Sequence, residues 1–284
     1  MSRIGSFPSR TYSRYRKIVY RHSTNSPYIS GDTFAQLCDV VIKDQGPRDL
    51  NMIKNARSIF CESHRLEEFI EDFRNIINAK IIFAGNSDYE FHNLNFNLPP
   101  SVKKMYLQNS FISDSKRIFT LPIGLENISL GGRNGSGVFS VIPYSFSYNR
   151  ILVGPFGPTH SIRNQIQNEF KLFSKQNNVD FLAERVSRRK YRDVLRNYNY
   201  VSCPRGNGVD THRLWESLYY GRFPIVQKNE WALSLAYLKL PITYINNWSI
   251  DELDFLRNLS PNIFDPNKIE GIWESYWHKT IKNV

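Results

Sequence analysis

The feature of this chain that most constrains its fold is an alternation of short apolar runs with longer amphipathic stretches. The apolar runs are rich in β-branched and aromatic residues, which favour strands, as in residues 58–61 and 80–83. Between such runs, residues 65–77 carry apolar side chains at the spacing of a helix face. Strands that alternate with helices in this way predict an α/β protein whose parallel sheets are covered on both faces.

The alternation extends over most of the chain and breaks once. Strands are predicted at residues 40–42, 58–61, 80–83, 117–121, 150–153, 198–202, 223–226 and 242–245. Helices are predicted at residues 65–77, 161–173, 211–220, 250–256 and 269–281. The break is a glycine-rich stretch at residues 131–137, which predicts a loop or an interdomain linker. A loop that cradles phosphate is the alternative interpretation, although no G-x-G-x-x-G register follows a strand there. We therefore expect two Rossmann-like domains, residues 1–145 and 146–284, with a ligand cleft between them.

Composition limits the class of protein. The chain has 284 residues, of which 41% are hydrophobic, and this suits folded domains rather than bulk disorder. No apolar run approaches the ~20 residues of a membrane-spanning helix. The three cysteines are scattered, which favours free thiols in a reducing compartment. These features predict a cytoplasmic protein.

The formal net charge of +11 calls for an explanation. Six basic residues and no acidic one occur within the first 21 residues. This segment has two interpretations, a solvated basic arm or an arm attracted to anionic lipid head groups or to a phosphorylated acceptor. Peripheral contact with an anionic membrane is therefore one of the expected partners.

The segment from Tyr200 to Val226 carries the clearest chemical signal. It predicts a strand, a glycine-containing loop, a helix and a second strand, with Gly221 ending the helix. Glycine in such a loop lets the backbone approach a ligand, and the new helix directs its N–H groups towards it. Asp210 or Thr211 is expected to cap this helix.

Two charged residues on that helix match the two parts of a nucleoside diphosphate. Arg213 and Glu216 are three residues apart and therefore lie on the same side of the helix. A guanidinium group matches phosphate oxygens, and a carboxylate accepts hydrogen bonds from ribose hydroxyls. An ordinary surface ion pair is the alternative. Leu214 and Leu218 are expected to form the buried face.

The whole run resembles the donor-site signature of exostosin-like glycosyltransferases, especially their microbial and viral relatives. The matching residues are Ser202-Cys203-Pro204-Arg205-Gly206-Asn207-Gly208, His212-Arg213-Leu214-Trp215-Glu216-Ser217-Leu218 and Gly221-Arg222-Phe223-Pro224-Ile225-Val226. Weaker similarity covers residues 29–34, 85–88 and 121–127. The resemblance implies a GT-B-like architecture of two facing Rossmann-like domains, with the acceptor on the N-terminal side. It also implies that Arg213 contacts the diphosphate of the donor and Glu216 its ribose, with Arg205 as a second phosphate contact. We assign Gly206, Asn207, Gly208, Asp210 and His212 to the same donor site.

Other residues are candidates for phosphate binding and catalysis. Arg163 lies in the first turn of a predicted helix after a strand and is a candidate phosphate ligand, with a solvated arginine as the alternative. Asp88 follows a predicted strand and is a candidate general base, although its Asn-Ser-Asp context also suits a turn. Asp32 is a second candidate base, with helix capping as the alternative.

The resemblance implies a glycosyltransferase that moves a sugar from a nucleotide-sugar, with UDP-sugar favoured, to a hydroxyl of a glycan or glycolipid in surface polysaccharide synthesis. Inversion at the anomeric carbon is implied by the resemblance alone, because the residues do not distinguish it from retention, and the reaction is expected to be metal-independent. Neither H-E-x-x-H nor a D-x-D pair occurs, so no metal and no cofactor is expected. One rival is a basic nucleic-acid-binding protein, although no such motif is present and we expect no nucleic-acid partner. Another is a catalytically inactive relative that binds sugar nucleotides. A P-loop is absent, which disfavours phosphoryl transfer.

Overall fold

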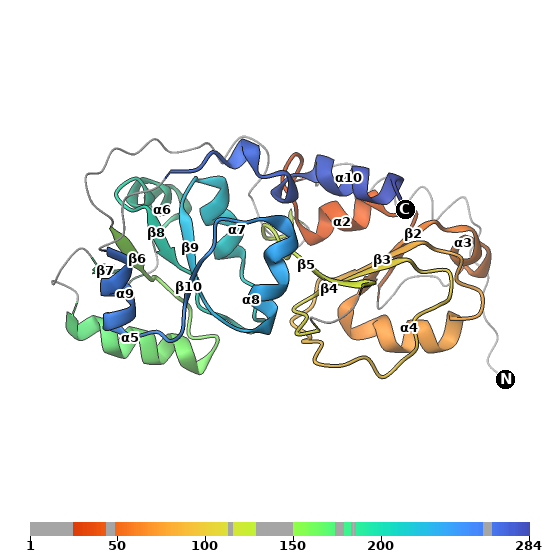
Figure 1. Cartoon of the computed structure of the whole chain (residues 1–284), viewed down its shortest axis with the longest axis horizontal. Coiled ribbons are helices and arrows are strands. Elements are labelled where there is room, and N and C mark those ends of the chain that lie inside the picture. Colours follow the sequence, from red (N-terminus) through yellow and green to blue (C-terminus); the bar gives the residue numbers. More distant parts are fainter. Residues whose placement is uncertain are drawn as a thin grey trace. The chain divides into compact units, whose positions relative to one another are not determined.

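The computed structural model describes residues 25–43, 49–112, 116–128, 150–173, 179–182, 184, 186–257 and 263–284. The glycine-rich stretch, the basic N-terminal arm and the expected domain boundary near residue 145 lie outside these residues. The chain divides into two compact units, unit 1 (Met1–Ser136 and Trp273–Val284) and unit 2 (Gly137–Ile272). Each unit contains one five-stranded parallel sheet, so the predicted α/β class is confirmed (Figure 1).

Unit 1 contains five strands and four helices in its described part. The strands are β1 (Val40–Ile42), β2 (Ser58–Glu62), β3 (Ile81–Gly85), β4 (Lys104–Gln108) and β5 (Ile118–Leu121). The helices are α2 (Gly31–Leu37), α3 (Leu50–Asn55), α4 (Leu66–Phe73) and α10 (Glu274–Lys282). Strand order follows chain order, β1-β2-β3-β4-β5. Right-handed crossovers in one direction place the connecting helices on one face, which leaves the other face to α2 and α10 (Figure 1).

The two faces of this sheet carry different side chains because neighbouring residues of a strand point to opposite sides. One face packs aliphatic residues such as Ile59, Ile82 and Met105 against α4. The other carries an aromatic row in register, with Phe83 beside Tyr106 and Tyr106 beside Phe119. Trp277 of α10 meets the rings of Phe83 and Tyr106 nearly edge-on, at 6.0 and 5.3 Å.

The C-terminal helix therefore belongs to unit 1, which corrects the expectation that residues 146–284 form the second domain. Trp277 is fully buried in this core. The backbone of Glu274 donates to the carbonyl of Pro27 (2.9 Å), and the ring of Trp273 lies 5.6 Å from that of Tyr28. The end of the chain thus contributes to the core of the first unit.

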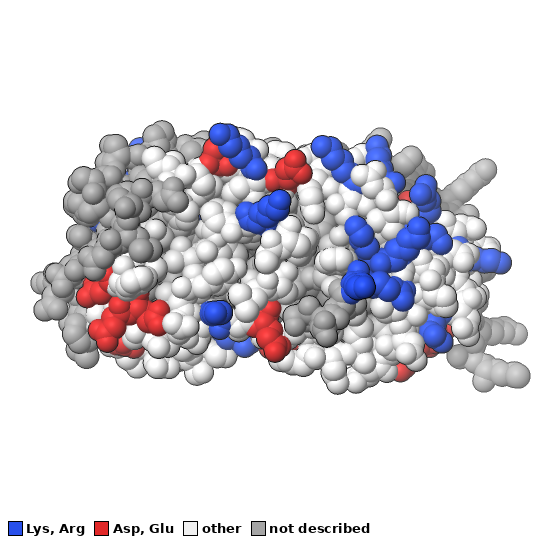
Figure 2. Space-filling view, in the orientation of Figure 1, with Lys and Arg blue, Asp and Glu red and all other residues white. Residues whose placement is uncertain are grey.

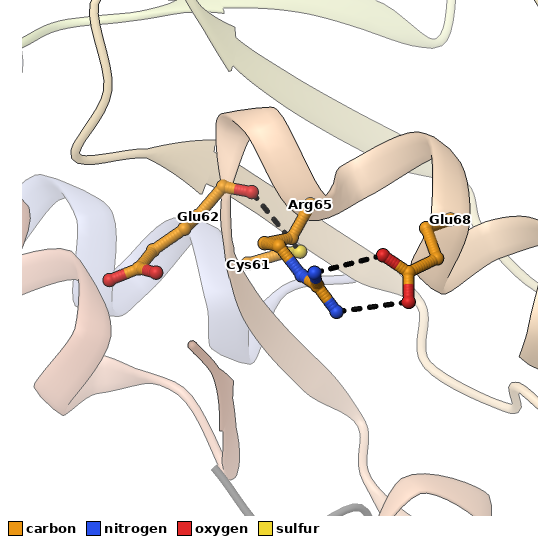
Figure 3. A network of polar contacts seen from close by, with 4 residues as sticks. All are labelled: Cys61, Glu62, Arg65 and Glu68. Atoms are coloured by element: carbon orange, nitrogen blue, oxygen red, sulfur yellow. Dashed lines mark hydrogen bonds and ion pairs between the residues drawn. The ribbon is translucent and has the colours of Figure 1, made fainter. Parts of the chain in front are cut away.

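A polar turn joins β2 to α4. Arg65 and Glu68 form a bidentate ion pair, with Nη1–Oε2 and Nη2–Oε1 distances of 2.9 and 3.0 Å (Figure 3). The thiol of Cys61 donates to the carbonyl of Glu62 (3.4 Å), while the Glu62 carboxylate points away from the ion pair in Figure 3. The pair supports the first turn of α4.

Unit 2 has a different strand order. Its strands are β6 (Ile151–Val153), β7 (Val179–Phe181), β8 (Tyr200–Ser202), β9 (Phe223–Gln227) and β10 (Thr243–Ile245). Its helices are α5 (Ser161–Phe173), α6 (Arg188–Leu195), α7 (His212–Tyr219), α8 (Glu230–Ser234) and α9 (Ile250–Arg257). The spatial order is β10-β9-β8-β6-β7. The chain goes outward from β6 to β7, returns to β8 on the other side, and continues to β10. This is a doubly wound sheet with helices on both faces.

The core of unit 2 follows from that winding. Ile166 and Phe170 of α5 pack with Leu253 and Leu256 of α9 in one apolar cluster. Leu214 and Leu218 of α7 are also buried, which confirms the predicted buried face of that helix. Gly221 ends α7 with φ +72°, a conformation that glycine adopts without strain.

Candidate functional site

The strand order of unit 2 identifies one place for a ligand. The direction of winding reverses between β6 and β8, which are parallel neighbours. The loops that follow these two strands, residues 154–160 and 203–211, therefore leave the same edge of the sheet side by side. In open α/β sheets, ligands bind in the crevice outside the carboxyl ends of the strands at such a reversal. The predicted donor residues lie on these loops and on the helices that follow them.

Two arginines tie these loops together in a reciprocal arrangement, which we call the arginine clasp (Arg163 and Arg213). Arg213, on the helix after β8, donates through Nη1 to the carbonyl of Gly154 (2.8 Å) and through Nη2 to that of Pro155, both in the loop after β6. Arg163, on the helix after β6, donates through Nε to the carbonyl of Arg205 (2.8 Å) and through Nη2 to that of Pro204 (3.1 Å), both in the loop after β8. Each helix thus holds the loop of the other strand.

The clasp concentrates positive charge at the reversal point. Both guanidinium groups lie near the ring of Phe156, with Cζ-to-centroid distances of 5.8 Å for Arg163 and 5.1 Å for Arg213. Their carbonyl partners are neutral, so these hydrogen bonds orient the guanidinium groups without cancelling their charge. Burial, and then the charge of Arg213, lower the pKa of Arg163 from 12.5 to about 10. An anion at this point would relieve that unfavourable environment.

Gly206 lets the loop after β8 come close to the clasp. A Cβ atom at this position would lie 3.0 Å from Nη2 of Arg163 and 3.2 Å from Oγ1 of Thr159. In the same loop, Gly208 is buried and Asn207 is exposed. Arg205 is partly buried, and its Nη2 lies 3.4 Å from the carbonyl oxygen of Asn207. The loop therefore presents backbone and an arginine beside the clasp.

The start of α7 differs in part from the expectation. Thr211 occupies the N-cap position, but its side chain makes no capping hydrogen bond. Asp210 is only 3% exposed and accepts a hydrogen bond from Nε1 of Trp215 (2.9 Å). We assign Asp210 to anchoring the loop on α7 rather than to direct ligand contact. His212 is partly buried at the first position of the helix.

The charges of Arg213 and Glu216 both affect Tyr191, which agrees with their predicted position on the same side of α7. Desolvation raises the pKa of Tyr191. The positive charge of Arg213 lowers this pKa, and the negative charge of Glu216 raises it. The hydroxyl of Tyr191 accepts a hydrogen bond from Nη1 of Arg213 (3.2 Å). Burial raises the pKa of the nearby Cys203 thiol to about 12, so this thiol stays protonated at neutral pH and is a poor nucleophile.

The two candidate bases lie in unit 1 and differ in exposure. Asp88 is exposed in the loop that follows β3. Asp32 lies in the first turn of α2 and is only 1% exposed, and its backbone N–H donates to Oδ1 of Asn127 (2.9 Å). A general base must reach the proton it removes, so the geometry favours Asp88 over Asp32 for contact with an acceptor.

Sequence reasoning missed a network of amide side chains around these aspartates, the amide network (Asn86, Gln108, Asn109 and Asn127). Asn127 donates to Oδ1 of Asn86 (2.8 Å), and the backbone of Asn86 donates to Oε1 of Gln108 (3.0 Å). Gln108 and Asn109 both donate to the carbonyl of Ser87 (2.9 and 3.3 Å). The available signal was the polar residues that directly follow apolar runs, as at residues 86–88 and 108–110.

Reasoning from sequence also missed the partners that hold the clasp, because backbone carbonyls of prolines and glycines carry no chemical signature. Within the described residues, no group of three or more His, Cys, Asp and Glu side chains is placed to hold a metal ion. In the same residues, no helix has the length and apolar character needed to cross a membrane. No known protein-family model matches the sequence, and no curated protein matches it.

Proposed function

We propose that the protein is a glycosyltransferase of GT-B type that binds a nucleotide-sugar donor at the carboxyl edge of the unit 2 sheet. The observation that carries this proposal is the arginine clasp at the point where the sheet winding reverses. A doubly wound sheet favours a nucleotide at this place, and two adjacent guanidinium groups favour a diphosphate.

The way in which the nucleotide-sugar would bind follows from the guanidinium N–H groups that the clasp leaves available. A guanidinium group has five N–H donors. Within the described residues, the hydrogen bonds of Arg213 to Gly154, Pro155 and Tyr191 use three of them. The two bonds of Arg163 use two. The remaining N–H groups, together with the positive ends of α5 and α7, would hold the diphosphate. Glu216 would accept hydrogen bonds from the ribose, and Arg205 would add a second phosphate contact.

The reaction is a direct displacement with inversion at the anomeric carbon of the sugar. Asp88 would take the proton of the acceptor hydroxyl, whose oxygen forms a bond to the anomeric carbon. The bond from that carbon to the phosphate oxygen breaks, and the nucleoside diphosphate leaves with the bonding electrons. Arg163 and Arg213 would stabilise the charge that develops on the leaving group. We propose that this step needs no metal ion.

The acceptor is proposed to be a hydroxyl of a glycan or glycolipid, bound beside the amide network of unit 1. Amide groups both donate and accept hydrogen bonds, so they suit neutral hydroxyls better than charged groups. With a UDP-sugar as the donor, such an enzyme would act in surface polysaccharide synthesis in the cytoplasm.

Calorimetric titration with UDP, GDP, CMP and ADP tests the donor site. We expect one nucleotide to bind, and Arg163→Ala and Glu216→Ala each to weaken it about ten- to hundred-fold, because each removes a hydrogen bond that involves a charged group. Arg196→Ala is the control, since the side chain of Arg196, the residue after α6, is 60% exposed and lies 4.0 Å from the carboxylate of Asp193. Unfolding temperatures without ligand identify variants that fail to fold.

Two other results would replace the proposal. Nucleotide binding without sugar transfer to any acceptor in a glycan panel would indicate an inactive relative that binds sugar nucleotides. Absence of nucleotide binding by folded protein, with salt-dependent binding to random oligonucleotides, would indicate a nucleic-acid-binding protein.

A further inference from the structure

The amino edge of the unit 1 sheet carries a row of basic residues that the proposed reaction does not use. A basic residue precedes or begins each of the strands β2 to β5, and another lies in the last turn of α3. We call this set the basic row (Lys54, Arg57, Lys80, Lys103, Lys104, Lys116 and Arg117). It lies at the opposite edge of the sheet from Asp88 and the amide network, because all these strands are parallel.

Backbone hydrogen bonds show that the members of the basic row are neighbours. Lys80 donates to the carbonyl of Arg57 (2.8 Å), and Lys103 and Lys104 both donate to the carbonyl of Lys80 (2.8 and 3.1 Å). The amide of Met105 donates to the carbonyl of Arg117 (2.7 Å). Strands about 4.8 Å apart place the row from β2 to β5 along about 14 Å of sheet edge.

The lysines of this row have no carboxylate partner in the part of the chain that the structure describes. Asp39, which precedes β1 at this edge, accepts from the backbone N–H groups of Arg57 and Ser58 and from the Ser58 hydroxyl. Arg117 donates to the carbonyls of Pro99 and Val102, which are neutral. Lys and Arg side chains also gather visibly over the β1–β5 part of the molecule in Figure 2.

We propose that the basic row binds the anionic head groups of a lipid bilayer. Five of its seven members are lysines, whose compact ammonium groups act as point charges suited to diffuse attraction to a charged surface. Nucleic-acid grooves combine basic residues with aromatic side chains on which bases stack. Phe119, which lies 6.0 Å from the ammonium group of Lys104, is stacked on Tyr106 within the sheet. A bilayer is therefore the partner that fits.

Binding of the basic row to a bilayer leaves the carboxyl edge of the unit 1 sheet accessible. A strand of five residues is about 16 Å long, so head groups bound at the amino edge would not cover Asp88 or the amide network. The sequence adds six basic residues within its first 21, which would increase attraction to the same lipids. The proposal is independent of the sugar-transfer proposal, because it concerns other residues and another edge of the sheet.

Vesicle flotation of the full chain tests this proposal. The vesicles contain phosphatidylcholine alone or mixed with phosphatidylserine. The row variant carries Lys54→Gln, Lys80→Gln, Lys103→Gln and Lys104→Gln, and it keeps the N-terminal arm. The control variant carries Lys171→Gln, Lys228→Gln, Lys239→Gln and Lys268→Gln, which remove the same charge from exposed lysines of unit 2.

We expect the wild type to float only with vesicles that contain phosphatidylserine, and the row variant to bind them about ten-fold or more weakly. The control variant should stay within about two-fold of the wild type, and added salt should weaken binding of all three. Circular dichroism confirms that each variant is folded. Three results would overturn the proposal: no binding by the wild type, equal loss in both variants, or row-dependent binding of a random oligonucleotide that exceeds binding to the vesicles.

Discussion

At the carboxyl edge of the unit 1 sheet the prominent polar side chains are amides, whereas at the same edge of the unit 2 sheet they are guanidinium groups. In unit 1, amide groups bond to one another and to the backbone, and the exposed carboxylate of Asp88 lies in the same loop as Asn86. In unit 2, two arginines bond to neutral carbonyls, so the edge keeps their positive charge. Two parallel sheets of five strands therefore present opposite ligand chemistries, because the loops and not the strands carry them.

Topology differs along with chemistry. The strands of unit 1 follow chain order, whereas those of unit 2 reverse at β6 and β8. At the reversal, Arg163 and Arg213 bridge the loops that follow β6 and β8. In unit 1 the space is instead filled by close packing, since a Cβ atom on Gly31 would lie 1.6 Å from Oδ1 of Asn86. At this edge, unit 1 thus presents closely packed amides beside the exposed carboxylate of Asp88, and unit 2 presents two guanidinium groups.

The largest effect is expected from removing Trp277, on which one face of the unit 1 sheet depends. Trp277→Ala should lower the free energy of unfolding by about 3–5 kcal/mol, because it leaves a large cavity against the rings of Phe34, Phe83 and Tyr106. Denaturant unfolding measures this, with His278→Ala on the exposed side of α10 as the control. A loss below about 1 kcal/mol would show that α10 does not stabilise unit 1.

A glycine substitution in the amide network tests how rigid the unit 1 edge is. Gly31→Ala should destabilise the protein by about 1–3 kcal/mol, because the new methyl group displaces the amide of Asn86 from Asn127. Chemical denaturation measures the change. Gly157→Ala is the matched control, since the nearest atom to a Cβ there is 3.8 Å away. Equal stability of the two variants would show that the side chain of Asn86 moves aside without a cost in stability.

The corresponding substitution in unit 2 should act on binding more than on stability. Gly206→Ala brings a methyl group 3.0 Å from the flexible end of Arg163, which can shift, so we expect a loss of stability below about 1 kcal/mol. The shift would move a guanidinium group of the clasp and weaken nucleotide binding measurably in calorimetry. Unchanged nucleotide affinity of folded Gly206→Ala would show that the loop after β8 is not part of the donor site.

The smallest effect is expected from an exposed ion pair of unit 1. Arg65→Ala should lower the free energy of unfolding by about 0–0.5 kcal/mol, because the side chains of Arg65 and Glu68 are 25% and 49% exposed and water screens them (Figure 3). A double-mutant cycle with Glu68→Ala measures the coupling. A coupling above about 1 kcal/mol would show that charge contributes more to unit 1 than the comparison implies.

The sequence by itself determined the class of fold and most of its elements. Helix 161–173 and strand 40–42 have the predicted bounds, and the loop, helix and glycine stop from Cys203 to Gly221 occur as expected. These features depend on local patterns, since periodicity of apolar residues and glycine at a left-handed position act over a few residues. Strand β4 was missed because Lys104 and Gln108 leave only three apolar residues between them, and pairing with β3 and β5 supplies the rest.

Only the tertiary structure decided which residues meet. Nothing local in residues 274–282 indicates that α10 packs in unit 1, because its aromatic side chains would suit any apolar face. Asp210 resembles a ligand contact or a cap in the sequence, yet it bonds to Trp215 in the interior. Arg163 and Arg213 are 50 residues apart and meet through carbonyls of each other's loops. Such contacts depend on strand order, which long-range packing selects and local sequence patterns do not encode.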